Sequence, residues 1–207
     1  MWKIESIREA DFGCEERMPG QKLKCLVTLV NEKGDRRNFE VNDEWLTENN
    51  LDEGGRWYDF WGWEKADILA ITNEYEGIRT PRDLYDALSH IWCEDTCAPR
   101  LRNKWNRENM TLGQCSITAF LAQDIFGGKV YGILRDGGNY HCYNVVGECV
   151  FDLTSEQFGN EVLSYDNNPE QFRDVHFAKE EKRMRYEYLK KSLKNCDTIA
   201  ERSNNYE

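Results

Sequence analysis

The segment that most constrains the fold is residues 111–128, because it places one cysteine at the start of a helix that is apolar on nearly every side. Its sequence is TLGQCSITAFLAQDIFGG. Apolar residues from Ile117 to Phe126 cover most faces of the predicted helix, and Gly127-Gly128 ends it. A helix without a polar face belongs inside a core, so we expect a central, rigid helix that opens at Cys115.

Cys115 stands where a thiol nucleophile is usually mounted. The unpaired N–H groups and the positive dipole end of a helix N-terminus favour a thiolate, and the thiolate is the form that attacks carbonyl carbon. The alternative is an inert, buried cysteine, which is a common residue in protein cores. The residues that follow in the chain favour the nucleophile.

The segment from Tyr140 to Asp152 predicts two strands rich in Val, Tyr and Phe, joined by a turn at Val146-Gly147. A two-residue turn there pairs His141 with Asp152 directly, and their Cβ atoms would then lie about 5 Å apart. A three-residue loop with Gly147 in a bulge is the competing register, because the β-branched Val146 resists positive φ. That register sets His141 against Phe151.

Each of these residues also has a simpler interpretation. His141 fits a structural histidine on a strand, and Asp152 fits a cap for the turn before Ser155. Asn144 would replace Asp152 as the group that orients His141 if the register slipped, but it should face away from His141. Strand alternation likewise places Cys142 on the face opposite His141, outside the same site.

Four short motifs resemble the YunG-like family of bacterial proteins. They are Trp105 with Leu112-Gly-Gln-Cys115-Ser-Ile-Thr-Ala, Asp124-x-Phe126-Gly-Gly128, His141-x-Tyr-Asn144, and Asp152-Leu-Thr-x-x-Gln-Phe158. The resemblance covers roughly residues 100–160. More distantly, a Cys, a His and an Asp in this order resemble the papain-like superfamily, which includes transglutaminase-like and NlpC-type peptidase domains.

The resemblance implies a fold and a set of roles. Cys115 matches the nucleophile, His141 the base and Asp152 the orienting acid. Gln114 is a candidate oxyanion donor, although papain's glutamine lies several residues before its cysteine and Gln114 is adjacent. The fold implied is an α+β papain-like core, with the Cys-bearing helix packed on an antiparallel sheet, over residues 76–207. A small β-rich module would precede it over residues 1–75.

The N-terminal part predicts strands at Trp2–Ile7, Gln21–Asn31 and Arg36–Val41, with Leu23, Cys25, Val27 and Leu29 alternating. The segment Trp57–Trp63 holds five aromatic residues in seven positions. Such a cluster is either a recognition surface or a hydrophobic plug between the module and the following domain, and the cost of exposed apolar patches favours the plug.

Two further helices are expected. Thr80-Pro81 begins one, with Thr80 as N-cap, and Leu84, Leu88 and Ile91 are its buried stripe. The segment Phe177–Cys196 predicts a charged helix with Tyr186, Leu189 and Leu193 on one face. Residues 155–158 predict a short helical turn, and residues 197–207 predict a frayed end.

The charge of the chain bears on its partners. A net charge of -11 and a pI near 4.9 oppose binding to phosphate backbones, so we expect no nucleic-acid partner. The N-terminal module is the more acidic part and is a candidate site for a protein partner. A mean hydropathy of -0.80, with no long apolar run, predicts no membrane association.

Cysteine use and the start of the chain bear on location. The start intersperses charges and lacks the apolar core of a signal peptide, so we expect a cytoplasmic protein whose eight cysteines are reduced. His90, Cys93 and Cys97 have spacing that suits a metal on a helix, but no second ligand pair accompanies them, so no metal site is expected. The chemistry at Cys115 needs no cofactor.

The sequence therefore predicts cysteine-dependent acyl transfer by Cys115, His141 and Asp152 on a peptide, amide or protein substrate. Water as the second acceptor would give a hydrolase, and an amine would give a transglutaminase-like transferase. The alternative, from another functional class, is a non-catalytic domain that keeps the fold and binds a protein.

Overall fold

The computed structural model describes residues 1–9 and 22–196, and it divides the chain into two compact units, Met1–Tyr58 and Asp59–Glu207. The division expected from the sequence lay between residues 75 and 76. The structure places residues 59–75 in the second unit, because this segment pairs with it: the N–H of Ile71 donates to the Ile125 carbonyl at 2.8 Å, and Trp61 forms a β-bridge with Asp152.

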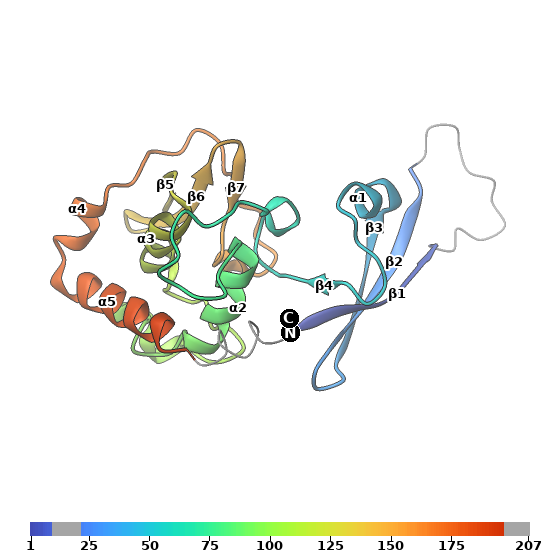
Figure 1. The fold of residues 1–207 in the computed structure, drawn as a ribbon, viewed down its shortest axis with the longest axis horizontal. Helices are drawn as coiled ribbons and strands as arrows, with labels where there is room; N and C mark the ends of the chain where they lie inside the picture. Colours follow the sequence, from blue (N-terminus) through green and yellow to red (C-terminus); the bar gives the residue numbers. More distant parts are fainter. Residues whose placement is uncertain (10–21, 197–207) are drawn as a thin grey trace. The chain divides into compact units, whose positions relative to one another are not determined.

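The first unit is a four-stranded antiparallel sheet in the order β3-β2-β1-β4, with one short helix (Figure 1). Its elements are β1 (Trp2–Glu9), β2 (Lys24–Asn31), β3 (Arg36–Asn42), α1 (Asp43–Glu48) and β4 (Arg56–Trp57). The three strands expected from the sequence are present, but the second begins at Lys24, because residues 22 and 23 lie outside the sheet. The predicted start at Gln21 lies outside the described residues.

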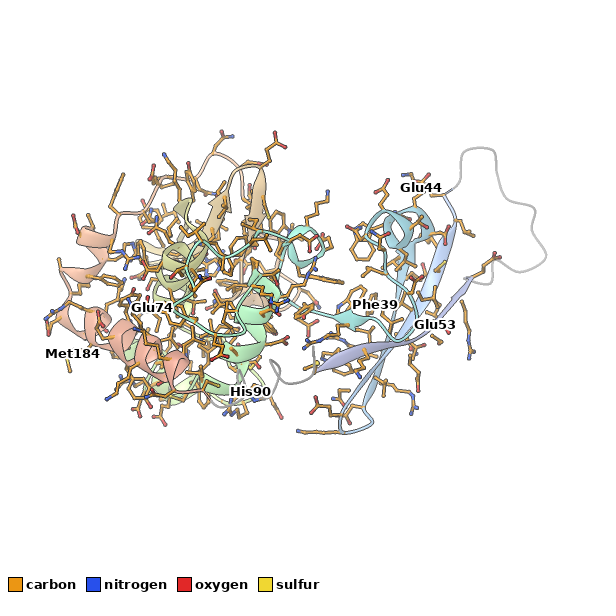
Figure 2. All side chains as sticks on the ribbon, in the orientation of Figure 1. Phe39, Glu44, Glu53, Glu74, His90 and Met184 are labelled. Atoms are coloured by element: carbon orange, nitrogen blue, oxygen red, sulfur yellow. The ribbon has the colours of Figure 1, made fainter. Side chains whose placement is uncertain are left out.

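The core of this unit follows the predicted alternation. Cys25, Val27 and Leu29 on β2 are buried on one face of the sheet, where they meet Ile4 and Leu46. Glu44, in the first turn of α1, is exposed and labelled in Figure 2. One apolar face and one solvated face are usual for a small antiparallel sheet.

The second unit combines helices with a three-stranded antiparallel sheet, which makes the described chain an α+β protein (Figure 1). The sheet runs β5-β6-β7, with β5 (Lys129–Arg135), β6 (Asn139–Val146) and β7 (Cys149–Phe151). The helices are α2 (Pro81–Ile91), α3 (Cys115–Phe126), α4 (Arg173–Phe177) and α5 (Glu180–Lys194). Three short 3-10 turns are η1 (Trp63–Lys65), η2 (Pro99–Lys104) and η3 (Ser155–Phe158).

Helix α3 is the centre of this unit, as its composition predicted. Nine of its twelve residues are buried, and it packs against β6, β5, α5 and α2. Gly127 follows the helix with φ of 75°, a backbone conformation that favours glycine. The surrounding elements therefore hold the first residue of α3 in place.

The two flanking helices also match the sequence pattern. Thr80 and Asp83 form a capping box at the start of α2, and Pro81 is its first residue. On α5, Tyr186, Leu189 and Leu193 are buried. Met184 lies on the opposite side of α5 and is 63% exposed (Figure 2).

Some elements differ from the expectation. Strand β5 and helix α4 were not predicted, and the charged helix begins at Glu180 instead of Phe177. The expected frayed end, residues 197–207, lies outside the described residues. Within residues 1–9 and 22–196, no helix combines the length and the apolar character that crossing a membrane requires.

Candidate active site

A tight turn delivers Cys115 to the first position of α3. Gly113, two residues earlier, has φ of 71°, and a Cβ there would lie 2.8 Å from Cys97 Sγ and 3.0 Å from the Ala98 nitrogen. The Gly113 carbonyl accepts hydrogen bonds from the Ala98 N–H at 3.0 Å and from the buried Arg185 at 3.5 Å. Glycine is therefore required at this turn for its backbone conformation and for its lack of a side chain.

The hairpin that carries His141 uses a register that differs from both predicted ones. Asn144 pairs with Phe151, and Val146 pairs with Cys149, so the two-residue turn is Gly147-Glu148. Gly147 has φ of 59°. A turn moved one residue along leaves Val146 in the strand and gives the positive φ to glycine, which avoids the strain that a β-branched residue would have at Val146 in the predicted two-residue turn.

This register leaves Asp152 diagonal to His141. Because Asn144 pairs with Phe151, the next residue, Asp152, comes opposite Tyr143. Tyr143 and His141 are two residues apart on β6 and share one face of the sheet, so Asp152 lies on the same face as His141. The ring nitrogen Nε2 of His141 lies 2.5 Å from Asp152 Oδ2, and both side chains are almost fully buried. Their predicted contact is present, although the pairing expected to produce it is not.

Asp152 uses its two oxygens for different partners. Its Oδ1 accepts hydrogen bonds from the N–H and the hydroxyl of Thr154, at 3.0 and 3.2 Å, which is the turn-capping role. Its Oδ2 accepts from His141 and from the Tyr165 hydroxyl, which lies 3.0 Å away. Asp152 therefore makes the contacts of a turn cap through one oxygen and contacts His141 through the other.

Tyr165 was not predicted to be part of this site. Burial and the Asp152 carboxylate raise the pKa of Tyr165, so its hydroxyl stays a donor. Its ring stacks on Trp61 with centroids 3.9 Å apart. Tyr165 lies in the irregular segment after η3, where no periodic pattern marks a residue as a partner of Asp152.

The thiol of Cys115 lies at an edge of β6. Strand β7 pairs only with residues 144–146, so within the described residues no strand flanks Tyr140 to Cys142 on that side. The sulfur is 3.9 Å from the Tyr140 carbonyl oxygen, and the backbone and side chain of Cys142 act to lower the pKa of Cys115. From a strand edge, one atom can reach side chains of both faces.

Cys142 is thus a second residue that sequence reasoning missed. The alternation argument was correct that Cys142 and His141 point to opposite faces, because Asn144, on the Cys142 face, donates to the Ala119 carbonyl on α3 at 2.8 Å. The conclusion that Cys142 lies outside the site was wrong. Both Cys142 and His141 act on the Cys115 thiol.

Charges and hydrogen bonds favour a thiolate and an imidazolium. The pKa of Cys115 is lowered well below its ordinary value. A hydrogen bond from the Cys142 thiol is the largest cause, and His141 acts in the same direction, whereas burial acts to raise the pKa. The hydrogen bond to Cys115 and burial raise the pKa of Cys142. Burial alone lowers the pKa of His141, but Asp152 and Cys115 outweigh it and raise that pKa to about 10.

The two nitrogens of His141 are in different situations. Nε2 faces the Asp152 carboxylate, which can only accept, so Nε2 carries a proton. Nδ1 is buried, and among the described residues it has no hydrogen bond of regular geometry. Cys115 and His141 each shift the pKa of the other. Because Asp152 engages Nε2, Nδ1 is the nitrogen that remains to exchange a proton with Cys115.

Gln114 and Asn144 lie away from the reacting atoms. The Gln114 side chain is fully buried, and its amide nitrogen donates to the Cys93 carbonyl at 3.1 Å. Gln114 is not among the residues that line the cleft beside Cys115. No side chain caps the backbone N–H groups at the start of α3, so these groups remain available as hydrogen-bond donors.

A cleft of about 650 Å³ opens beside Cys115 and His141. Cys115 itself is half-buried, so a ligand in the cleft would meet its sulfur. Ser116, Tyr140 and Phe158 also line the cleft, and the His141 and Phe158 rings meet edge to face, with centroids 4.7 Å apart. The volume is within the range of small-molecule sites.

Within the aromatic segment 57–63, Phe60 packs in the second unit and Trp61 contacts residues of this site. Phe60 is fully buried and packs on Tyr85, with centroids 5.0 Å apart. Trp61 is 45% exposed, and its carbonyl accepts the N–H of Asp152 at 3.0 Å. In the second unit, Trp61 thus contacts both Asp152 and Tyr165, a role that neither sequence interpretation included.

The three residues whose spacing suits a metal, His90, Cys93 and Cys97, do not come together in one site. His90 lies on the exposed side of α2 (Figure 2), whereas Cys97 is fully buried. In the part of the chain that the structure describes, no group of three or more His, Cys, Asp or Glu side chains is arranged to hold a metal ion. All seven cysteines of that part are free thiols.

Comparisons with known proteins place the site inside a family match. A family profile described as YunG protein matches residues 80–197, a range that contains Cys115, His141 and Asp152. A Bacillus subtilis (strain 168) protein described as "Uncharacterized protein YunG" is 31% identical over 100 residues, which are 48% of this chain and 84% of that protein. No solved structure matches the chain significantly.

Proposed function

The chain belongs to the YunG family, and from that premise we propose that it is a cysteine-dependent acyl-transfer enzyme. The family expected from the motifs is confirmed. The finer proposal adds that the second unit is a papain-like core, in which Cys115 is the nucleophile, His141 the base and Asp152 the group that orients it. A reducing compartment such as the cytoplasm suits a mechanism that depends on a free thiol.

One observation carries the proposal. His141 is bound through Nε2 to Asp152 at 2.5 Å, which leaves Nδ1 for a cysteine whose pKa is lowered beside an open cleft. A nucleophile, a base that contacts it and a third group that orients the base are the signature of covalent catalysis. A histidine with a purely structural role needs only the contact with Asp152.

The first half of the reaction forms a thioester. The Cys115 thiolate attacks the carbonyl carbon of an amide or ester, and the carbonyl π electrons move to oxygen. Backbone N–H groups at the start of α3 stabilise that oxygen. The imidazolium of His141 then gives its Nδ1 proton to the leaving amine or alcohol as the carbon–nitrogen or carbon–oxygen bond breaks.

The second half releases the acyl group. His141 takes a proton from water or from an amine, which attacks the thioester carbonyl, and the Cys115 thiolate leaves. Water gives a carboxylic acid and an amine gives a new amide. Asp152 keeps the Nε2 proton in place and stabilises the imidazolium throughout.

The test is to trap the thioester. Wild type is mixed with p-nitrophenyl acetate, and digestion with mass spectrometry locates the acetyl group. We expect acetylation of Cys115, and none at that position in Cys115→Ala. Cys149→Ala, which removes a cysteine outside the cleft, is the matched control and should behave as wild type.

Two further readouts complete the test. Continued release of nitrophenolate measures turnover, and the acetyl product, acetate in water or an amide when a primary amine is added, separates hydrolase from transferase. Equal, slow acetylation of Cys115 and of the other accessible cysteines would instead favour a non-catalytic, protein-binding domain that keeps the fold.

A further inference from the structure

The cleft beside Cys115 is positively charged, although the chain as a whole carries a net charge of -11. Five of its lining residues are Lys or Arg, and two are Asp or Glu. The cations are Arg100, Arg135, Lys179, Lys182 and Arg185, and the acids are Asp136 and Glu181. A cleft that concentrates one sign of charge against the sign of the whole molecule favours a ligand of opposite charge.

Two of the five cations are already engaged. Arg135 pairs with Glu161 at 2.8 Å and lies over the Phe158 ring. Arg185 pairs with Glu181 at 3.0 Å and donates to the Thr96 carbonyl. These two arginines are parts of the cleft wall.

Three cations are left without a carboxylate. Arg100 and Lys179 are exposed, and Lys182 is half-buried. Within residues 1–9 and 22–196, none of the three has an ion-pair partner in the structure. An ordinary surface lysine needs no partner, but a half-buried one is desolvated at a cost that a bound anion would offset.

Lys182 is held in one position by a chain of hydrogen bonds. Its ammonium lies 3.0 Å from Nδ1 of His176, and Nε2 of His176 lies 3.0 Å from Gln171 Oε1. Burial and the nearby Lys182 charge lower the pKa of His176 to about 4, so the ring is neutral and accepts at Nδ1. An ammonium has three donors, and this contact uses one of them.

Lys182 is also close to the reacting sulfur. Burial lowers the pKa of Lys182, while the charges of Cys142 and Cys115 act to raise it, which places its ammonium within electrostatic reach of both thiols. Lys182 and Cys115 line the same cleft. An anion that binds Lys182 would therefore lie beside the carbonyl that Cys115 attacks.

We propose that the acyl donor of this enzyme carries a carboxylate close to the scissile carbonyl, and that Lys182 binds this carboxylate, with Lys179 and Arg100 at the cleft rim. The inference rests on the proposed function and specifies its substrate class: an acidic amide, such as a peptide bond that follows or precedes Asp or Glu. Lys182 is a specificity residue that contacts the substrate.

Two alkylating agents that differ in charge test the proposal. Rates of Cys115 alkylation by neutral iodoacetamide and by anionic iodoacetate are measured at pH 7.5. In Lys182→Met, the iodoacetate rate divided by the iodoacetamide rate should fall about fivefold, since one unit charge near the sulfur is lost. Lys191→Met removes an exposed lysine of α5 that does not line the cleft, and it should leave the ratio unchanged.

The ratio separates failure of this inference from failure of the proposed function. Slow, ordinary alkylation of Cys115 by iodoacetamide would overturn the proposed function. Rapid iodoacetamide alkylation with the same ratio in wild type and Lys182→Met would overturn the substrate class alone. Because both reagents react with the same thiolate, the ratio also cancels any change in the thiolate population that the substitution causes.

Wild type alone gives a second measurement, which does not depend on the variant folding. Raising the salt concentration should slow iodoacetate more than iodoacetamide, because salt screens the cations at the cleft. Glutarate or a short Glu-containing peptide should protect Cys115 from iodoacetamide. Protection by inorganic phosphate but by neither carboxylate would overturn the assignment of a carboxylate.

Discussion

His141 and Asp152 are joined by a 2.5 Å hydrogen bond, although the strand pairing leaves them diagonal to each other. The contact forms because β7 ends at Phe151, and Asp152 is held by the Trp61 carbonyl and by Thr154 instead of by a strand neighbour. Tyr165 donates to the same carboxylate. The Asp152 carboxylate is therefore positioned by the residues around the strand end more than by the hairpin itself.

Asp152→Asn tests the charge of this carboxylate. Asn keeps an oxygen for the Thr154 contacts but removes the negative charge that raises the pKa of His141 to about 10. We expect that pKa to fall, because burial then acts without opposition. The rate of acyl transfer should fall by about 10² to 10⁴.

The measurement is the pH dependence of acetylation at Cys115. In wild type, activity should decline only as the pH rises through about 10, whereas in Asp152→Asn the decline should begin at lower pH. Asp166→Asn, an exposed site nearby, is the control. An unchanged alkaline limb in Asp152→Asn would show that Asp152 has no electrostatic role.

Cys142→Ala tests the thiol that contacts the nucleophile. The hydrogen bond from Cys142 is the largest effect that lowers the pKa of Cys115, so its removal should raise that pKa. The acid limb of Cys115 alkylation should move to higher pH. Cys142→Ser keeps a donor and should move it less, and equal behaviour of the two variants would argue against the hydrogen bond.

Gly113→Ala tests the turn before the nucleophile. The new Cβ would lie 2.8 Å from Cys97 Sγ at a φ of 71°, so contact and backbone strain add. We expect a loss of about 2 to 3 kcal/mol in the free energy of unfolding. Gly138→Ala is the matched control, with φ of 75° and no atom within 4 Å, and should cost about 1 kcal/mol. Urea unfolding of both variants measures the difference, and equal losses would contradict the contact.

The buried His176 predicts a pH dependence of stability. Its pKa is lowered to about 4 in the folded protein from an ordinary value of 6.5, so below pH 6.5 the unfolded chain binds more protons than the folded one. The free energy of unfolding should therefore decrease as the pH falls from 6.5 to 4, by up to about 3 kcal/mol from this residue. His176→Gln should flatten the curve over that range, and a curve of the same slope would rule out this source.

The sequence predicted the elements that depend on local patterns. Cys115 at the start of an all-round apolar helix, the Thr80-Pro81 helix start and the alternation of Cys25, Val27 and Leu29 each follow from residue spacing and capping alone. Local preferences dominate in such segments, and tertiary contacts reinforce them. The contact between His141 and Asp152 was predicted by one of the two registers considered, because that register placed both side chains on one face of the sheet.

What the sequence did not predict depends on contacts between distant segments. The register moved to Gly147-Glu148 because glycine takes the positive φ, a difference of one residue that patterns do not resolve. Tyr165 reaches Asp152 from an irregular segment. Cys142 joins the site because Cys115 lies at a strand edge, where the alternation of faces no longer separates neighbours.

The most direct measurement of the central claim is the rate of iodoacetamide alkylation at Cys115 as a function of pH, followed by digestion and mass spectrometry, in wild type and in His141→Ala. The thiolate–imidazolium pair predicts rapid alkylation of wild type well below pH 8, and a shift of this alkylation to higher pH in His141→Ala. The same ordinary thiol profile in both proteins, rising only near pH 8 to 9, would contradict a catalytic role for the pair.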